Sequence, residues 1–418
     1  MVRYQGGPNA GHSIVINGQR VVLHQIPSGI LRGDCSAVGG PGMVVSPTDL
    51  VGEIRSLRQA GLFRGTLYLS DRAHVILPWH RIEDAWEEEM RGKTPGGTTL
   101  RGIGPAYEDR AGRWGIRLGE LARPHLLHER LERLYRVKSH INGEGRELPP
   151  IDTVAAELHA AYEELQTYIH PTEPLLWRAI EHGEHVLLEG AQGSLLDIDY
   201  GTYPYTTSSH TTVAGAFTGA GLPPRELDSI LGITKAYATR VGNGPFPTEL
   251  FDATGERLRE RGGERGATTG RPRRCGWLDL VLLRYAARVN GFTSFAVTKV
   301  DVLGGEDEVK VGTAYQARDG TRFTDYPPSV AEDFEKIEPV YETFPSWGEF
   351  TPALKDRIRN EGWEALPREL IQYLRYVGEE TGVPVSLVSY GAGRDETVEF
   401  PPSLPVSRSL TEWSSPSW

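Results

Sequence analysis

The chain has 418 residues, of which 39% are hydrophobic and 24% are charged, and its formal net charge is −11. This length allows a large core in one large domain or two, whereas the excess of acidic residues argues against a general nucleic-acid-binding protein, which needs a broad basic surface. Because no apolar run is long enough to span a bilayer and the first residues lack the pattern of a secretory signal, we expect a cytoplasmic protein without a membrane partner.

The first predicted elements are a β-hairpin and a helix. Residues 13–16 and 20–23 flank Asn17-Gly18, a dipeptide typical of a type I′ turn. Ser46 is suited to cap a helix that begins at Pro47 and ends at Gly61. Later segments with clear patterns are a strand at 66–69, a mostly helical region at 121–180 interrupted around 142–150, a strand at 185–189, a helix at 277–289, a strand at 294–297, a helix at 364–379 and a strand at 385–388.

Strands that alternate with helices, and glycine-rich loops that follow strands, indicate an α/β protein with a large, mostly parallel central sheet flanked by helices. We expect residues 1–400 to form a single domain with a helical insertion at about 120–182, followed by a peripheral tail, rich in Pro and Ser, at 401–418. Such sheets bind ligands at the carboxyl ends of their strands. Cys35 and Cys275 are far apart in the sequence, and we expect reduced thiols rather than metal ligands.

One short loop concentrates positive charge. Residues 266–274 contain two threonine hydroxyls, glycine, and the guanidinium groups of Arg271, Arg273 and Arg274. Guanidinium groups match the two oxygens of a carboxylate or phosphate, and hydroxyls and glycine allow close approach of a small ligand. The segment indicates a site for a small anionic ligand, although the same residues also suit a solvated basic loop.

Two loops indicate a pocket for guanine. Thr298-Lys299-Val300-Asp301 follows an apolar strand, and the Asp301 carboxylate can accept hydrogen bonds from both N1–H and the 2-amino group of guanine, a pattern that adenine lacks. The stem of Lys299 can pack along the base, and backbone groups of residues 389–394 can complete the pocket. The alternatives are a surface ion pair and a plain strand-to-turn connection.

Three further loops and a hydroxyl cluster suit a nucleotide monophosphate. Residues 6–12 form a loop of small residues that ends in His12. Its backbone N–H groups can reach a phosphate, and the imidazole can stabilise a transferring phosphoryl group. Residues 97–105 and 189–193 offer similar loops, and residues 206–209 offer four hydroxyls in a row. Each feature taken singly is also compatible with an ordinary turn.

The order of these motifs resembles that of the adenylosuccinate synthetases, and the resemblance extends from the first residues to about Glu399. It rests on the segments Gln5-Gly6-Gly7-x-Asn9-Ala10-Gly11-His12, Gly102-Ile103-Gly104-Pro105-Ala106-Tyr107, Glu189-Gly190-Ala191-Gln192-Gly193, Gly201-Thr202-Tyr203-Pro204-Tyr205, Gly244-Pro245-Phe246-Pro247-Thr248-Glu249, Thr268-Thr269-Gly270-Arg271 and Thr298-Lys299-Val300-Asp301.

The resemblance implies a P-loop-NTPase-like architecture and an enzyme that joins IMP to L-aspartate, with GTP as co-substrate and a Mg²⁺ in each subunit. Such enzymes phosphorylate the 6-oxygen of IMP and then displace that phosphate with the amine of aspartate. The products are adenylosuccinate, GDP and phosphate, on the route to AMP. A phage-type relative that acts on dGMP, and a non-catalytic guanine-nucleotide-binding homologue, are the alternatives.

The resemblance also implies roles for individual residues. His12 assists transfer of the γ-phosphoryl group, and the carbonyl of Gly11 is a magnesium ligand. Arg113 reaches IMP in the other subunit of a homodimer. The residues implied in GTP binding are Gly11, His12, Ser13, Arg273, Lys299, Val300, Asp301, Ser389, Tyr390 and Gly391. Those implied in IMP binding are Asn9, Ala10, Gly11, His12, Thr99, Arg113, Gln192, Thr207 and Arg271. Those implied in aspartate binding are Ala267, Thr268, Thr269, Gly270, Arg271, Pro272 and Arg273.

The start of the chain departs from the family pattern. Family members carry a strand and the loop Gly-Asp-Glu-Gly-Lys-Gly-Lys upstream of the Asn-Ala-Gly-His motif, and this loop supplies the base at N1 of IMP and groups that hold GTP phosphates. Because this chain starts at Met1-Val2-Arg3-Tyr4, we expect that strand and loop to be missing and an apolar seam of the sheet to be exposed. We therefore expect little or no synthetase activity from the polypeptide as written.

Overall fold

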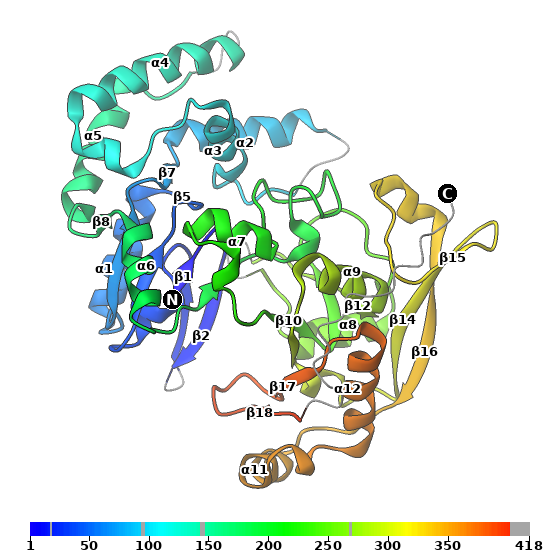
Figure 1. Ribbon diagram of the computed structural model, residues 1–418. Coiled ribbons are helices and arrows are strands. Elements are labelled where there is room, and N and C mark those ends of the chain that lie inside the picture. Colours follow the sequence, from blue (N-terminus) through cyan, green and yellow to red (C-terminus); the bar gives the residue numbers. More distant parts are fainter. Residues whose placement is uncertain (17–18, 93–96, 143–146, 267–269, 402–418) are drawn as a thin grey trace.

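The computed structural model describes residues 1–16, 19–92, 97–142, 147–266 and 270–401. Strands alternate with helices along most of this chain (Figure 1). Most of the strands that position the candidate site pair in parallel. The structure confirms the predicted α/β class, with mostly parallel central strands flanked by helices.

The first parallel sheet is built from the N-terminal half of the chain. Its strands lie in the order β8 (Ile169–His170), β6 (Thr66–Ser70), β4 (Ser36–Gly39), β1 (Val2–Arg3) and β9 (Leu188–Glu189). Every pairing in this sheet is parallel. The carboxyl ends of β1, β4 and β9 therefore meet at one edge, where the candidate loops 4–11 and 190–193 begin.

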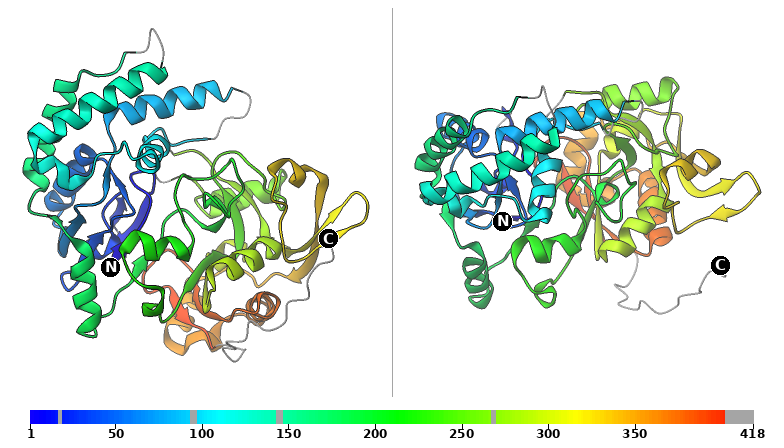
Figure 2. Two further views of the ribbon diagram at one scale, coloured as in Figure 1. Left: turned by 45° about the horizontal axis from the view of Figure 1, so that its top comes forward. Right: turned by 90° about the horizontal axis from the view of Figure 1, so that it is seen from above.

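The second parallel sheet comes from the C-terminal half. Its strands lie in the order β10 (Leu231–Lys235), β13 (Ser294–Thr298), β17 (Val385–Ser389) and β18 (Thr397–Glu399). The first three are parallel, and β18 is antiparallel to β17. Lys235 lies opposite Thr298, so the loops that follow β10 and β13 leave from the same edge. Figure 2 shows the two parallel sheets in separate halves of the molecule.

A third sheet, which the sequence patterns do not predict, extends the C-terminal half. Its members are β11 (Tyr237–Arg240), β12 (Arg274–Asp279), β14 (Glu308–Ala317), β15 (Arg322–Phe323) and β16 (Ile337–Pro345). The long antiparallel ribbon of β14 and β16 is yellow in Figure 1. Two small pairs remain: β5 (Val44–Val45) with β7 (His74–Val75), and β2 (His12–Ile16) with β3 (Gln19–Leu23). The second pair confirms the predicted hairpin, whose Asn17-Gly18 turn lies outside the described residues.

Helices cover both halves (Figures 1 and 2). The N-terminal half carries α1 (Pro47–Gln59), α2 (Pro78–Met90), α3 (Ile103–Gly112), α4 (Pro124–Asn142), α5 (Ile151–Leu165), α6 (Thr172–Glu181) and α7 (Val213–Ala220). The C-terminal half carries α8 (Ala253–Arg261), α9 (Leu280–Asn290), α10 (Val300–Leu303), α11 (Pro352–Glu361) and α12 (Arg368–Thr381). Within the described ranges, none of the helices has both the length and the apolarity that crossing a membrane requires.

Each half has its own large apolar core. The first lies between the first sheet and its helices and includes Leu67, Trp79 and Leu131. The second lies between β12, β13, β14 and β17 and the helices α9 and α12, and it includes Phe295 and Val311. Burial of apolar side chains on this scale is the main force that fixes the strand ends in place.

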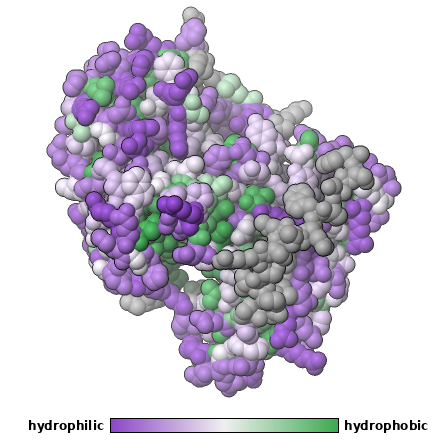
Figure 3. Space-filling view, viewed as in Figure 1, coloured by the Kyte–Doolittle hydropathy of each residue, from purple (hydrophilic) through white to green (hydrophobic). Residues whose placement is uncertain are grey.

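Apolar side chains are also exposed at two sheet edges. Leu187, next to β9, is 60% exposed, and Leu231 and Ile233 of β10 are 45% and 75% exposed. β9 and β10 are the end strands of their sheets. Figure 3, which views the molecule as in Figure 1, shows apolar surface near the middle of the molecule and mostly hydrophilic surface around it.

One predicted helix begins later than expected. The segment 277–289 was expected to be helical throughout, but α9 begins at Leu280 because residues 274–279 pair as strand β12. Asp279 ends the strand and caps the helix, since its Oδ1 accepts a hydrogen bond from the Leu282 amide at 3.1 Å. The apolar residues of 277–279 serve the strand as well as they would serve a helix, so their pattern alone does not separate the two.

Other differences are smaller. The predicted helix 364–379 begins at Arg368, because Pro367 precedes it in an extended conformation. The strand predicted at 185–189 shortens to the two residues of β9, and the short strand β8 lies inside the region predicted as helical. Ser46 is at the N-cap position of α1, but its hydroxyl accepts a hydrogen bond from Arg81 at 3.0 Å and does not cap the helix.

Candidate active site

His12 is held by an acidic partner. It is the first residue of β2, and its Nδ1 lies 2.8 Å from Oε1 of Glu189 at the end of β9. The other carboxylate oxygen accepts a hydrogen bond from the Ser28 amide at 3.0 Å. Burial works to raise the pKa of Glu189, but the hydrogen bond and charge of His12, the Ser28 amide and the nearby Arg3 bring that pKa below its usual value. An ionised carboxylate only accepts hydrogen bonds, so Glu189 orients the ring through Nδ1–H and leaves Nε2 for a ligand.

The loop before His12 is hydrogen-bonded to two other loops and to helix α3. Gln5 Nε2 donates to the Ala191 carbonyl at 2.7 Å, and Ser209 Oγ donates to Gln5 Oε1 at 2.9 Å. The Tyr107 hydroxyl accepts from the Gly6 amide at 2.9 Å and donates to the Gly42 carbonyl at 2.8 Å. The structure thus brings the loop 4–11 together with the loops 190–193 and 206–209 and with helix α3.

Most of the residues predicted to bind a monophosphate lie in these loops, and Thr99 lies in the loop 97–105. Asn9 Oδ1 accepts from the Gly7 amide at 3.2 Å, and the Ala10 carbonyl accepts from His24 Nδ1 at 2.9 Å. Ala10 is buried, whereas Asn9, Gly11, Thr99 and Thr207 are half-buried.

Gln192 presents a buried amide to the same loops. Both Oε1 and Nε2 are buried and have no hydrogen-bond partner within the part of the chain that the structure describes. They lie 3.1 and 3.3 Å from the position that a Cβ would take on Gly6. An unpaired buried amide is costly, so a ligand with both a donor and an acceptor would relieve it.

Left-handed backbone marks the candidate loops. Among the described residues, the non-glycine residues with positive φ are Leu100, Arg113, Gln192 and Lys299, with φ of 56, 66, 65 and 60°. Leu100, Gln192 and Lys299 lie in the candidate loops, and Arg113 is the residue that the resemblance implies to reach the other subunit. Such conformations are unfavourable for residues with a Cβ and collect at functional sites. Arg113 follows α3, and its side chain is exposed.

Residues 266–274, called the arginine loop below, contact the loop that carries Thr99 and the residues around Lys299. Arg271 Nη2 donates to the carbonyls of Gly97 and Thr98 at 2.9 and 3.1 Å, which places it beside the loop that carries Thr99. Arg273 Nη1 donates to Glu264 Oε2 at 3.1 Å. Gly270 and Pro272 are exposed. The predicted residues Ala267, Thr268 and Thr269 lie outside the described residues.

Lys299 and Asp301 lie at the carboxyl end of β13. Lys299 Nζ donates to the Gly262 carbonyl and, at 2.9 Å, to Glu264 Oε1. Asp301 is half-buried, and burial raises its pKa. Val300, between them, is fully buried, so only its backbone can reach a ligand.

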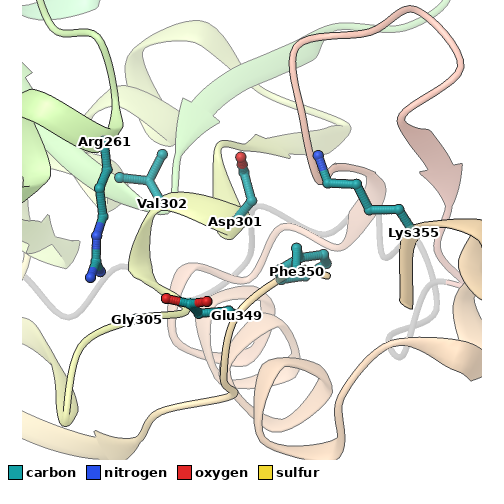
Figure 4. Close-up of a pocket in the computed structure, with 7 residues that line it drawn as sticks. All are labelled: Arg261, Asp301, Val302, Gly305, Glu349, Phe350 and Lys355. Atoms are coloured by element: carbon teal, nitrogen blue, oxygen red, sulfur yellow. The ribbon is translucent and has the colours of Figure 1, made fainter. Parts of the chain in front are cut away.

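A cavity of 310 Å³ opens beside Asp301. Figure 4 shows Asp301 and Lys355 near the ring of Phe350, with Arg261 and Glu349 farther along the cavity. Tyr390 is buried, and its ring stacks on that of Phe350 with 6.2 Å between the ring centroids. The Ser389 hydroxyl donates to the Gly391 carbonyl at 3.1 Å. Phe350 and Lys355 lie in no motif, so the sequence offered no signal for them.

Asp197, Asp199 and His210 form a cluster with the composition of a metal site, but its buried member stabilises a loop. Ligand atoms of Asp197, Asp199 and His210 lie within 4.8 Å of one another. Asp197 is fully buried, however, and its Oδ2 already accepts hydrogen bonds from the amides of Thr211 and Thr212 at 2.6 and 3.0 Å. We attribute this cluster to the folding of the loop around 197–212.

Comparison with known proteins identifies the family. The family model described as Adenylosuccinate synthetase matches residues 1–398. The chain belongs to the adenylosuccinate synthetase family.

Two bacterial members are similar over almost their whole length. Adenylosuccinate synthetase of Hahella chejuensis is 47% identical over 402 residues, which cover 95% of this chain and 91% of the relative. That of Myxococcus xanthus is 46% identical over 407 residues, which cover 95% of this chain and 92% of the relative. These comparisons do not support the expectation that the family's N-terminal strand and phosphate loop are missing, and the expected lack of synthetase activity, which depended on it, is withdrawn.

Two solved structures share the fold, and one of them is similar enough in sequence to support the family. The fully ligated adenylosuccinate synthetase of Plasmodium falciparum has a TM-score of 0.88 at 34% identity, over 96% of this chain and 93% of that one. The succinoaminodeoxyadenylate synthetase (PurZ) of cyanophage S-2L, bound to dGMP and dATP, has a TM-score of 0.57 at 19% identity, over 95% of this chain and 87% of that one. The second likeness shows a shared fold alone.

Proposed function

We propose that the chain catalyses the GTP-dependent ligation of L-aspartate to IMP, giving adenylosuccinate, GDP and phosphate, in AMP biosynthesis in the cytoplasm. The observation that carries the proposal is the position of the arginine loop. Its Arg271 contacts the loop that carries Thr99. Its Arg273 shares Glu264 with Lys299 of residues 298–301, called the guanine motif below. A dicarboxylic acid bound at this loop would lie between a nucleotide monophosphate and a guanine nucleotide.

The proposed chemistry has two steps. IMP gives up its N1 proton to solvent as its 6-oxygen attacks the γ-phosphorus of GTP, so that an O–P bond forms and the bond from the γ-phosphorus to the β-phosphate oxygen breaks, releasing GDP. The amine of aspartate then attacks C6, and the bond from C6 to the phosphorylated oxygen breaks, releasing phosphate and a proton. An oxo group leaves poorly whereas phosphate leaves well, which is why the first step is needed.

Individual side chains have proposed parts in these steps. His12, oriented by Glu189, stabilises the charge on the transferring phosphoryl group. Asn9, Thr99, Gln192, Thr207 and Arg271 hold IMP, and the buried amide of Gln192, which has no hydrogen-bond partner among the described residues, suits the edge of the base. Arg271 and Arg273 pair with the carboxylates of aspartate.

We also propose a Mg²⁺ in each subunit. Magnesium prefers oxygen ligands, including those of substrate phosphates, and the half-buried Gly11 offers a carbonyl directly before His12. When bound, the ion would neutralise negative charge on the phosphates.

A steady-state assay that follows adenylosuccinate formation from IMP, GTP and aspartate tests the proposal. We expect turnover that requires all three substrates. Guanine-nucleotide binding without phosphate release would contradict it and favour a non-catalytic homologue. Turnover with dGMP in place of IMP would contradict the proposed acceptor.

Replacing Glu189 by Gln is expected to lower kcat by about 10- to 100-fold with little change in KM, because a hydrogen bond to a charged group contributes about 1.5–3 kcal/mol and Glu189 acts through His12. Steady-state kinetics measure the effect. Glu164→Gln, which removes an exposed carboxylate paired with Arg55, is the control and should leave kcat unchanged. An E189Q variant with the kcat of the unmodified enzyme would show that Glu189 does not orient His12.

We propose that the enzyme is a homodimer in which Arg113 contacts IMP in the other subunit, since this exposed arginine is held in a left-handed conformation at the end of α3. Arg113→Ala and His12→Asn should each be almost inactive. Mixing the two under conditions that allow subunit exchange should restore part of the activity, because mixed dimers contain one site with both native residues. A mixture as inactive as its components would contradict shared sites.

A further inference from the structure

Glu264 lies where the arginine loop meets the guanine motif, and its side chain is 1% exposed. Its Oε1 accepts hydrogen bonds from Lys299 Nζ at 2.9 Å, from Lys235 Nζ at 2.9 Å and from the Tyr237 hydroxyl at 2.6 Å. Its Oε2 accepts one from Arg273 Nη1 at 3.1 Å. One buried carboxylate therefore contacts a side chain from each of two candidate ligand loops.

The backbone around Glu264 is fixed as well. Its carbonyl accepts a hydrogen bond from the Arg273 amide at 2.9 Å, and its own amide donates to the Arg259 carbonyl at 2.9 Å. Lys299 Nζ makes a second hydrogen bond, to the Gly262 carbonyl. Both cations are thus held against the same short segment, and neither depends on a flexible surface contact.

The electrostatics agree with a carboxylate that is permanently ionised. Burial works to raise the pKa of Glu264, but the charge of Lys235 and the hydrogen bonds from Lys235, Tyr237 and Lys299 lower it to about 2. A buried charge is stable only when it is paired and hydrogen-bonded. The two cations from the ligand loops, Arg273 and Lys299, outnumber this one carboxylate, whereas burial lowers the pKa of the third cation, Lys235, to about 8.

Arg271 differs from Arg273 in the contacts that hold its side chain. It belongs to the same loop, but its Nη2 donates to the carbonyls of Gly97 and Thr98. Its position is therefore set from the other side of the site. Loss of the Glu264 charge should disturb Arg273 and Lys299 and leave the contacts of Arg271 in place.

We propose that Glu264 is a positioning residue that fixes Arg273 and Lys299 relative to each other, so that aspartate and GTP bind to a prealigned pair of cations. This inference rests on the proposed function and adds to it. It couples the amino-acid site to the guanine site through one carboxylate that contacts neither substrate.

The test is Glu264→Gln, which keeps the size of the side chain but removes its charge. We expect the KM for GTP and the KM for aspartate each to rise by about 10- to 100-fold, as for loss of charged hydrogen bonds, while the KM for IMP changes little. The equilibrium Kd for GDP, measured by calorimetry without turnover, should rise by a similar factor. Glu83→Gln is the matched control, because Glu83 is also a buried carboxylate and pairs with Lys138 at 2.8 Å in the helical region. It should leave all of these constants unchanged.

The outcomes separate this inference from the proposed function. An unmodified enzyme that does not turn over would refute the proposed function, whereas the Kd for GDP would still decide the part played by Glu264. Unchanged KM and Kd values in E264Q would overturn the inference alone. A uniform rise in the three KM values, or a variant that does not fold, would also overturn it, since either result means a general structural role.

Discussion

His12→Asn is expected to lower kcat by about 10²- to 10⁴-fold, the range that a positioned side chain contributes to proton transfer and charge stabilisation. The KM values for IMP and GTP should change much less, because the imidazole acts on the transferring phosphoryl group and not on the bound ground states. Asn keeps a polar side chain of similar size but cannot carry the positive charge that a protonated imidazole can. Steady-state kinetics with each substrate varied in turn measure both effects.

His128→Asn is the control for this prediction. His128 lies on α4, outside the candidate loops, and its Nε2 is 3.2 Å from Oδ1 of Asp152. This variant should have the kcat of the unmodified enzyme. If His12→Asn raised KM and left kcat unchanged, His12 would be a binding residue and the proposed mechanism would lose its main catalytic side chain.

Asp301→Asn is expected to raise the KM for GTP by about 10- to 100-fold, because the hydrogen bonds from guanine N1–H and the 2-amino group to a charged acceptor contribute about 1.5–3 kcal/mol. The amide replaces one acceptor by a donor, which opposes the 2-amino group of guanine. Xanthine carries an oxygen at that position, so XTP should become a better phosphoryl donor for the variant than for the unmodified enzyme. Competition between GTP and XTP measures this change in preference.

Asp307→Asn changes an exposed carboxylate in the same part of the chain and should leave both nucleotides unaffected. Equal KM values for GTP in the Asp301 variant and the unmodified enzyme would show that the cavity beside Asp301 and Phe350 is not the guanine site.

The sequence predicted those parts of the fold whose signals are local. The hairpin at β2 and β3 follows from one Asn-Gly dipeptide, and α9 ends at Gly291 with φ of 65°, as a glycine after a helix predicts. The sequence did not predict the ribbon of β14 and β16, because its pairing joins segments on either side of a long connection. The boundary at Leu280 was also missed, since apolar residues before it suit either a strand or a helix.

The candidate site could be predicted as a set of loops but not as a set of contacts. Loops that follow parallel strands leave from one edge of the sheet, so the element order predicts that the loop 4–11 before His12, and Lys299 after β13, lie at the carboxyl ends of strands. The sequence indicated no role for Glu189 or Glu264, because only folding brings these carboxylates next to their partners. His12 and Glu189 are 177 residues apart in the chain. A buried carboxylate is recognised only when its neighbours in space are known.

Isotope transfer from IMP to phosphate tests the central claim most directly. With ¹⁸O at the 6-position of IMP, and with GTP and aspartate present, we predict that the label appears in the inorganic phosphate, because the 6-oxygen leaves C6 only as part of the phosphate. Release of the label as water, with unlabelled phosphate, would contradict phosphorylation of IMP and with it the arrangement of His12, the arginine loop and the guanine motif around one reaction.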